Sequence, residues 1–270
     1  MNKKARVGVI ILVCFVILAI FAPLIAPYSP IDKSFDSMAG PSMKHLFGTT
    51  QIGQDVFSEW VWGTRTSLLV GCIAGLSSTF LGLLIGLLAG YLPGVVDEIL
   101  SYVMNVFLVL PALPLMIVLA AYSPVKGMGL IILVIVFTGW AWGARVFRAQ
   151  VSTLRTRDYI VAARFAGDSL PRVLFKEIFP NMLSLVAAGA FSAAITAILA
   201  EAGLEFLGLG DPTMLSWGTM MFWAQNSGAL LQGQWAWMLV PGASISLLGA
   251  SLILMNFAVD QLSNPRLKKR

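Results

Sequence analysis

Side chains that carry out acid–base, nucleophilic or metal chemistry are scarce in this 270-residue chain. The single histidine, His45, and the two cysteines, Cys14 and Cys72, lie far apart, and their spacing matches neither a metal site nor a disulfide framework. No G-x-x-x-x-G-K-S/T sequence that would hold nucleotide phosphates is present. We therefore predict no catalytic site, no metal site and no cofactor in this chain. We expect the cysteines to pack as small apolar residues and His45 to lie at the surface of a polar loop.

Three polar residues inside apolar runs are the candidates for a translocation pathway. Glu201 and Glu205 stand one helical turn apart, and an ionisable side chain at membrane depth is costly unless it has a function. Both are placed to line the outer mouth of a pathway for a cationic or zwitterionic solute. The alternative is solvation at the interface, or an ion pair with Arg65 or with a partner chain. Asn105, inside another apolar run, is the third pathway candidate.

The composition requires the bilayer as solvent. Hydrophobic residues make up 58% of the chain, charged residues only 11%, and the mean hydropathy is +0.84. A soluble domain carries about 25% charged residues. Uncharged stretches of about 20 residues are typical of membrane-spanning helices. The predicted fold class is an all-α membrane protein with six transmembrane helices, near residues 7–27, 67–90, 99–121, 128–146, 182–203 and 237–260.

The basic residues predict the orientation. With both termini in the cytoplasm, 14 of the 18 lysines and arginines fall in the inner segments, and the reverse topology would leave 4 there. The positive-inside rule therefore predicts an N-in, C-in topology. Lysines and arginines beside anionic lipid explain the net charge of +5, so we expect a lipid bilayer and no nucleic acid as partner.

We expect one transmembrane domain over residues 1–270. Residues 1–65 form an N-terminal helix and an outer loop. The apolar start is too long for a signal peptide, and we expect it to stay uncleaved. Residues 66–260 form the core, which includes a cytoplasmic loop at 150–181, and residues 261–270 form a cytoplasmic tail.

Local features add detail to this layout. Five glycines between residues 71 and 90 share one helix face, which predicts a close helix contact. Pro111 and Pro114 predict a kink in the helix at 99–121. Asp55 and Arg65 are expected to organise the outer loop. The apolar segment 206–226, broken by Gly and Pro, predicts either a re-entrant cap or an interfacial anchor that includes Trp217 and Trp223.

The cytoplasmic loop predicts a short helix at 157–166, a turn at Gly167, and an amphipathic helix that Pro180 interrupts. Asp168 and Ser169 offer N-cap oxygens to the second helix. Alanines give the short helix a surface of low relief, and aromatic neighbours offer an anchor for another protein. The alternative is a helix that lies on its own protein or on lipid headgroups. The residues expected to contact a partner are Tyr159, Val161, Ala162, Ala163, Phe165, Ala166, Gly167 and Pro180.

This loop resembles the coupling loop of ABC importer permeases, whose signature is Glu-Ala-Ala, three residues, Gly, and later an Ile and a Pro. The matching residues are Ala162, Ala163, Gly167, Ile178 and Pro180. Val161 stands where the signature has Glu, so the resemblance implies no salt bridge to the partner from that position.

The resemblance extends over nearly the whole chain and indicates the dipeptide/oligopeptide/nickel permeases. The stretch HLFGTTQIGQDVFSEWVWGTRTSLLVG at 45–71 is similar to the family's FGTD-x-LGRD segment, with Thr50 and Gln54 in place of Asp and Arg. The stretch ILAEAGLEFLGLGDPTMLSWGTMM at 198–221 is similar to its AE-x-x-LSFLGLG segment. There Glu201 matches the family's Glu, and Glu205 replaces a Ser.

The family implies a type I ABC importer permease fold with a cytoplasmic coupling helix, in a prokaryotic cytoplasmic membrane. It implies half of a translocation pathway for peptides or a related small solute, worked by alternating access. The implied partners are two ABC ATPase subunits that bind ATP and Mg, a second homologous permease in a heterodimer, and an extracytoplasmic substrate-binding protein. The chain itself is then a non-catalytic membrane subunit.

Two other functions stay open on the residues alone. One is a stand-alone secondary transporter or channel, which would need buried charges in several helices. The other is a membrane scaffold that transports nothing. Neither explains the helix–Gly–helix loop. Dipeptides, oligopeptides, nickel chelates and sugars all remain open as the solute.

Overall fold

The computed structural model describes residues 3–263, and in that range it contains helices and no strand. Short 3₁₀ and π segments, labelled η, connect some of the helices. The elements are α1 Lys3–Ile20, α2 Ala22–Ile25, α3 Val56–Tyr91, α4 Val95–Val109, α5 Ala112–Tyr122, α6 Met128–Leu154, α7 Asp158–Phe165, α8 Leu170–Arg172, η1 Val173–Ile178, η2 Phe179–Met182, α9 Leu183–Phe206, α10 Trp217–Asn226 and α11 Trp235–Ser263.

Within residues 3–263, four helical stretches are long and apolar enough to cross a membrane: α3, α6, the stretch Leu170–Phe206, and α11 up to Phe257. The pair α4 and α5 makes a fifth if it counts as one span. The first predicted span, at 7–27, is shorter than expected, because α1 ends at Ile20 and a separate turn of helix follows. Three basic residues also fall in the first turns of α1, which leaves a short apolar part.

The helix predicted at 99–121 is two helices rather than one kinked helix. α4 ends at Val109, α5 begins at Ala112, and their axes differ by 86°. Leu110 has extended backbone, with φ −67° and ψ 130°, which is the conformation that a following proline favours. Pro111 and Pro114 also lack the N–H groups that a continuous helix would need. The predicted position of the bend is therefore right, and its size is larger than a kink.

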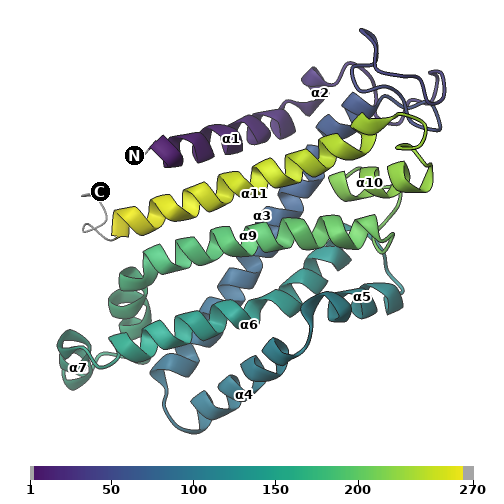
Figure 1. The fold of residues 1–270 in the computed structure, drawn as a ribbon. Helices are drawn as coiled ribbons and strands as arrows, with labels where there is room; N and C mark the ends of the chain where they lie inside the picture. The colour runs from purple at the N-terminus through teal and green to yellow at the C-terminus, as the bar shows by residue number, and fades with distance from the viewer. Residues whose placement is uncertain (1–2, 264–270) are drawn as a thin grey trace.

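α3 is the central helix of the molecule and packs against α6 and α9 (Figure 1). Its glycines make the close contact that the sequence predicts. A Cβ atom on Gly75 would lie 2.6 Å from Ala194 Cα of α9, and one on Gly86 would lie 2.8 Å from the carbonyl oxygen of Ala144 of α6. Only a glycine lets the backbones approach so closely.

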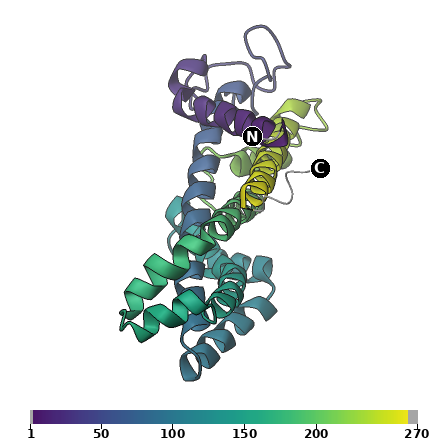
Figure 2. The same cartoon turned by 90° about the vertical axis from the view of Figure 1, so that its left-hand side faces the viewer.

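Different elements lie at the two opposite ends of the molecule. α7 lies at one end together with the start of α1 and the end of α11 (Figure 1). α2, the loop after it and α10 gather at the opposite end. Figure 2 looks from the α7 end and shows the purple α1 at one edge and the blue-teal α4 region at the other.

A cytoplasmic tail was expected over residues 261–270. Residues 261–263 complete α11, and residues 264–270 lie outside the described residues.

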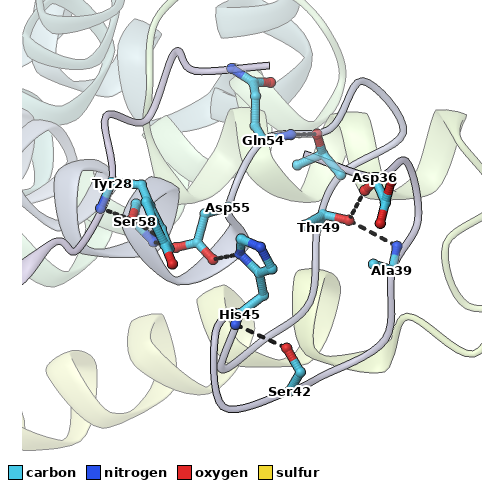
Figure 3. Close-up of polar contacts among 10 residues, drawn as sticks. Tyr28, Asp36, Ala39, Ser42, His45, Thr49, Gln54, Asp55 and Ser58 are labelled. Carbon is cyan, nitrogen blue, oxygen red and sulfur yellow. Dashed lines mark hydrogen bonds and ion pairs between the residues drawn. The ribbon is translucent and has the colours of Figure 1, made fainter. Parts of the chain in front are cut away.

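The end opposite α7 is organised by Asp55, as the sequence predicts (Figure 3). The buried carboxylate accepts hydrogen bonds from the Ser58 amide at 2.8 Å and the Ser58 hydroxyl at 2.7 Å, and so caps α3. This cap starts α3 at Val56, well before the predicted start near residue 67. Arg65, the other expected organiser, is exposed on α3 instead.

The expectation of a surface histidine is wrong. His45 Nδ1 lies 2.9 Å from Asp55 Oδ1, and its side chain is only 12% exposed. The ring packs against the rings of Tyr28 and Phe35. The loop therefore folds around a buried histidine–carboxylate pair.

Candidate functional site

The short helix α7 forms where the sequence predicts it and is attached to the bundle by one face. Ile160 is completely buried, and the partly buried Ala163 packs against the same apolar cluster. That cluster joins α3, α6 and the segment after α7 through Leu83, Leu87, Phe147, Val151, Leu154, Val173, Leu174, Ile178 and Met182. Ala163 was expected on the partner surface, but it lies on the same face of α7 as Ile160 and contacts this cluster.

The other face of α7 is open. The Phe165 side chain is 89% exposed, Tyr159 is 42% exposed, and Val161 is 36% exposed. Ala162 and Ala166 are exposed beside them and keep the relief low. Val161, Arg164 and Phe165 border a hollow of about 300 Å³. An exposed aromatic ring beside small residues has the form of a protein-docking anchor.

Gly167 ends α7 as predicted. Its φ is +82°, a conformation that side-chain-bearing residues rarely adopt. Its N–H donates to the Arg164 carbonyl at 3.1 Å, and the Asp168 N–H donates to the Ala163 carbonyl at 3.1 Å. This pair of bonds is the Schellman motif, which satisfies the last carbonyls of the helix. The turn sets the angle between α7 and the following helix.

The segment after the turn differs from the prediction in its details. Ser169 stands at the cap position, but its side chain makes no capping hydrogen bond, and Asp168 pairs with Arg172 at 3.2 Å. Pro180 interrupts the regular helix as predicted. It lies in the 3₁₀ segment η2, which follows the π segment η1 and leads into α9. The proline lacks the donor that a regular α-helix needs, so the helix changes geometry and continues.

Arg148 of α6 and Arg155, which caps the C-terminus of α6, attach the α7 end to its neighbours, and the sequence reasoning missed both. Arg148 donates to both carboxylate oxygens of Asp97 on α4, at 2.5 and 2.8 Å. Arg155 donates to the last carbonyls of α3, at 3.5 Å to Gly90 and 3.4 Å to Tyr91. Opposite charges at the same predicted membrane face were the available signal for the Arg148–Asp97 pair. Such fork-shaped pairing fixes geometry as well as charge.

Glu201 and Glu205 lie close together, and both are buried in the protein interior. Both are buried, at 0% and 2% exposed. Ser67 of α3 donates to Glu201 at 3.3 Å, and Ser216 donates to Glu205. Neither carboxylate is exposed at an open mouth in this structure, and neither pairs with Arg65, which is exposed. Their place on a translocation pathway stays a prediction. Close packing of α3, α9 and α10 encloses them.

The neighbouring pathway and loop predictions have mixed outcomes. Asn105 is exposed on α4, apart from the two glutamates. Residues 206–226 fold back as a loop followed by α10, which a capping box at Ser216 and Thr219 starts. Trp217 is completely buried there, so the interfacial-anchor expectation for it is wrong. Its amide donates to Ser67 at 3.2 Å, which ties α10 to α3.

A cavity that sequence reasoning did not predict lies between α3, the α4–α5 break, α6 and α9. Its volume is about 680 Å³, which is in the usual range of about 300–1,000 Å³ for small-molecule sites. Hydroxyl side chains and large aromatic rings both line it, among them Ser78, Thr138, Thr196, Phe107, Trp140 and Trp142. Four elements that are distant in the sequence form this cavity, so no local sequence pattern predicts it.

Two family models match the chain. The model described as "Binding-protein-dependent transport system inner membrane component" matches residues 82–269. The model described as "N-terminal TM domain of oligopeptide transport permease C" matches residues 1–41. Together they cover most of the chain, including α7.

Several curated proteins are similar over most of their length. The dipeptide transport system permease protein DppC of Escherichia coli (strain K12) is 38% identical over 99% of this chain and 91% of its own. DppC of Bacillus subtilis (strain 168) is 32% identical over 99% of this chain and 83% of its own. The oligopeptide transport system permease protein OppC of the same B. subtilis strain is 35% identical over 81% of this chain and 72% of its own.

The helical fold, the outward-facing α7 and this similarity lead to one conclusion. The chain belongs to the family of binding-protein-dependent transport system inner membrane components, as a multi-pass permease of the prokaryotic cytoplasmic membrane.

Proposed function

We propose that this chain is the permease subunit of an ATP-driven importer and forms half of the pathway for peptides or a related small solute. An extracytoplasmic binding protein delivers the solute, and a second, homologous permease forms the other half. The relatives named for dipeptide and oligopeptide transport support the class of solute. The observation that carries the proposal is α7, which is fixed to the bundle by one face and exposes an aromatic ring on the other.

In this proposal two ATPase subunits bind ATP and Mg, and one of them docks on α7 while the other docks on the second permease. Phe165 inserts into a recess of the ATPase, and the low relief of Ala162 and Ala166 lets the two surfaces approach. Tyr159 and Val161 border the contact. Closure of the ATPases on ATP pushes α7 toward the membrane. The permease itself contributes no catalytic group.

The push reaches the spans by two routes. The apolar cluster beneath Ile160 joins α7 to α3 and α6. The Gly167 turn joins it to α9 through η1 and η2. Packed cores move as rigid bodies rather than deform continuously, so displacement of α7 tilts the spans and alternates access. Pro180, in the irregular segment, is the hinge in this scheme.

The proposal places α7 in the cytoplasm, with both termini on the same side and α1 as the sixth span. α7 shares its end of the molecule with the start of α1 and the end of α11 (Figure 1). Basic residues crowd this end, among them Arg155, Arg157 and Arg164. The positive-inside rule supports this orientation.

Co-purification with the ATPase tests the proposal. The chain is expressed with its genomic neighbours, extracted in mild detergent and isolated through an affinity tag. We expect the wild type to retain an ATPase and the Phe165→Ala variant to lose it. Phe80→Ala is the matched control, because Phe80 is 61% exposed but lies on α3. An ATPase absent from the wild-type preparation, although expressed, would contradict the proposal.

A further inference from the structure

The cavity between α3, the α4–α5 break, α6 and α9 has an uncharged lining. None of the described residues that line it is acidic, basic or a histidine. Aromatic and aliphatic side chains provide most of its wall, and hydroxyl groups of serines and threonines provide the polar part. Such a lining accommodates an apolar group that carries a few hydrogen-bonding atoms, and it penalises a charged group, which would lose its hydration without a partner.

Most hydroxyls of the lining are already engaged inside the protein. Thr79 donates to the Gly75 carbonyl at 2.8 Å, and Thr138 donates to the Val134 carbonyl at 2.8 Å. Thr196 donates to the carbonyl of Ser192 at 3.0 Å. These bonds follow the ordinary pattern of hydroxyl side chains in helices. They leave these groups little free capacity to donate to a ligand.

Ser78 is different. Its side chain is 5% exposed, and its Oγ atom has no hydrogen-bond partner among the described residues. A buried hydroxyl without a partner is destabilising, because it has lost its hydration and gained no hydrogen bond. Gly139 of α6 stands opposite, and a Cβ atom there would lie 3.5 Å from Ser78 Oγ. The glycine therefore leaves room for another group beside the hydroxyl.

The broken helix also borders the cavity. Residues 107–112, which include the end of α4 and the start of α5, line its wall. Irregular backbone at membrane depth is tolerated where protein covers it or where it lines a polar cavity. Discontinuous helices of this kind are a known way to build solute sites in transport proteins. Both this backbone and the Ser78 hydroxyl favour a polar occupant over a lipid acyl chain.

We propose that this cavity holds an uncharged part of the transported peptide, an apolar side chain with its backbone amide, and that Ser78 hydrogen-bonds this amide. This inference rests on the proposed function. It makes Ser78 a specificity-determining residue of this permease. The solute preference of the complete transporter is then set partly by this chain and not by the binding protein alone.

The test uses the complete transporter in liposomes of phosphatidylethanolamine and phosphatidylglycerol. ATP-dependent uptake is measured for two tripeptides, Ala-Phe-Ala and Ala-Lys-Ala. All variants receive the same binding protein, so its own selectivity cancels in the ratio of variant to wild type. ATP hydrolysis is measured in the same preparations and reports assembly and coupling.

We expect Ser78→Ala to lower the uptake of Ala-Phe-Ala about fivefold, the usual effect of one lost hydrogen bond. The matched control is Ser77→Ala, because the neighbouring serine is only partly buried and does not line the cavity. Equal uptake by Ser78→Ala and wild type, with ATP hydrolysis intact, would overturn the role of Ser78. A Ser77→Ala effect as large as that of Ser78→Ala would overturn it too.

A second variant tests the cavity without relying on Ser78. Thr196→Asp adds a negative charge to the exposed part of the lining, and we expect it to raise the uptake of Ala-Lys-Ala relative to Ala-Phe-Ala about threefold, as opposite charges attract modestly where solvent screens them. An unchanged ratio would place the cavity off the solute path, as for a groove that a lipid chain fills, and would overturn the inference. Absence of ATP-dependent uptake by the wild type would instead contradict the proposed function itself.

Discussion

The two ends of this molecule are built from different interactions. At the α7 end, apolar contacts beneath Ile160 hold the short helix in place, and ion pairs lie around them. At the opposite end, buried carboxylates are tied by hydrogen bonds: Asp55 to Ser58, Glu201 to Ser67 and Glu205 to Ser216. One end leaves a phenylalanine ring 89% exposed, whereas the other encloses these three carboxylates almost completely.

This difference indicates which end another protein must complete. Buried carboxylates are costly unless their hydrogen bonds are made, and once made these bonds select a single arrangement. Hydrogen bonds within the chain therefore fix the arrangement around Asp55. Apolar contacts are non-directional, and an exposed aromatic ring gains free energy when a partner covers it. The α7 end is built to receive a partner and to move with it.

The largest effect on stability is expected from Asp55→Ala. The change leaves the Ser58 amide and hydroxyl and the His45 ring without their acceptor. We expect the free energy of unfolding to fall by roughly 3 kcal/mol. Thermal unfolding in detergent measures it, with Asp36→Ala as the control because Asp36 is exposed. Equal shifts for the two variants would contradict a special role for the buried carboxylate.

A smaller effect is expected from Gly167→Ala. The backbone at this position has φ +82°, and no atom lies within 4 Å of the added Cβ, so strain alone opposes the change. We expect a loss of about 1 kcal/mol in stability, together with a loss of ATP-driven uptake. The control is Gly129→Ala on α6, where the space is also open but φ is not in the left-handed range. Equal uptake by both variants would remove the turn from the coupling route.

The ion pair between Asp97 of α4 and Arg148 of α6 should contribute about as much to the free energy of unfolding as Gly167 does. Its two side chains are 34% and 25% exposed, so solvent screens the interaction. We expect Arg148→Ala to cost about 1 kcal/mol or less. Arg148→Asp should cost more, and the double variant with Asp97→Arg should recover part of the loss. Thermal unfolding of the three variants checks this, and a double variant less stable than Arg148→Asp would contradict the pairing.

Phe165→Ala should have the smallest effect on stability. The ring makes little contact with its own chain, so we expect a change within about 0.5 kcal/mol. The same variant should lose ATPase binding, whereas folded Asp55→Ala protein should keep it. These opposite outcomes sharpen the contrast between the two ends. A large loss of stability in Phe165→Ala would show that the ring serves the fold instead.

Local features were predictable from the sequence, and features that depend on distant contacts were not. The bounds of α7 and the turn at Gly167 follow from helix-forming residues that end in a glycine, so they matched closely. The partners of Glu201 were missed, because Ser67 lies 134 residues away along the chain. The cavity depends on four separate elements, and no spacing within one segment encodes it. The burial of Ala163 against the apolar cluster was missed, because the family pattern identifies the helix but does not indicate which of its faces packs against the bundle.

The most direct test of the account is cross-linking from single cysteines in a background without Cys14 and Cys72. Ala162→Cys lies on the exposed face of α7, Ala163→Cys faces the apolar cluster, and Met43→Cys lies at the opposite end, where Met43 is 96% exposed. With a short thiol–amine reagent, we expect Ala162→Cys to cross-link to the ATPase strongly, Ala163→Cys weakly and Met43→Cys not at all. Cross-links to the ATPase from Met43→Cys and none from Ala162→Cys would contradict the assignment of α7 as the docking site.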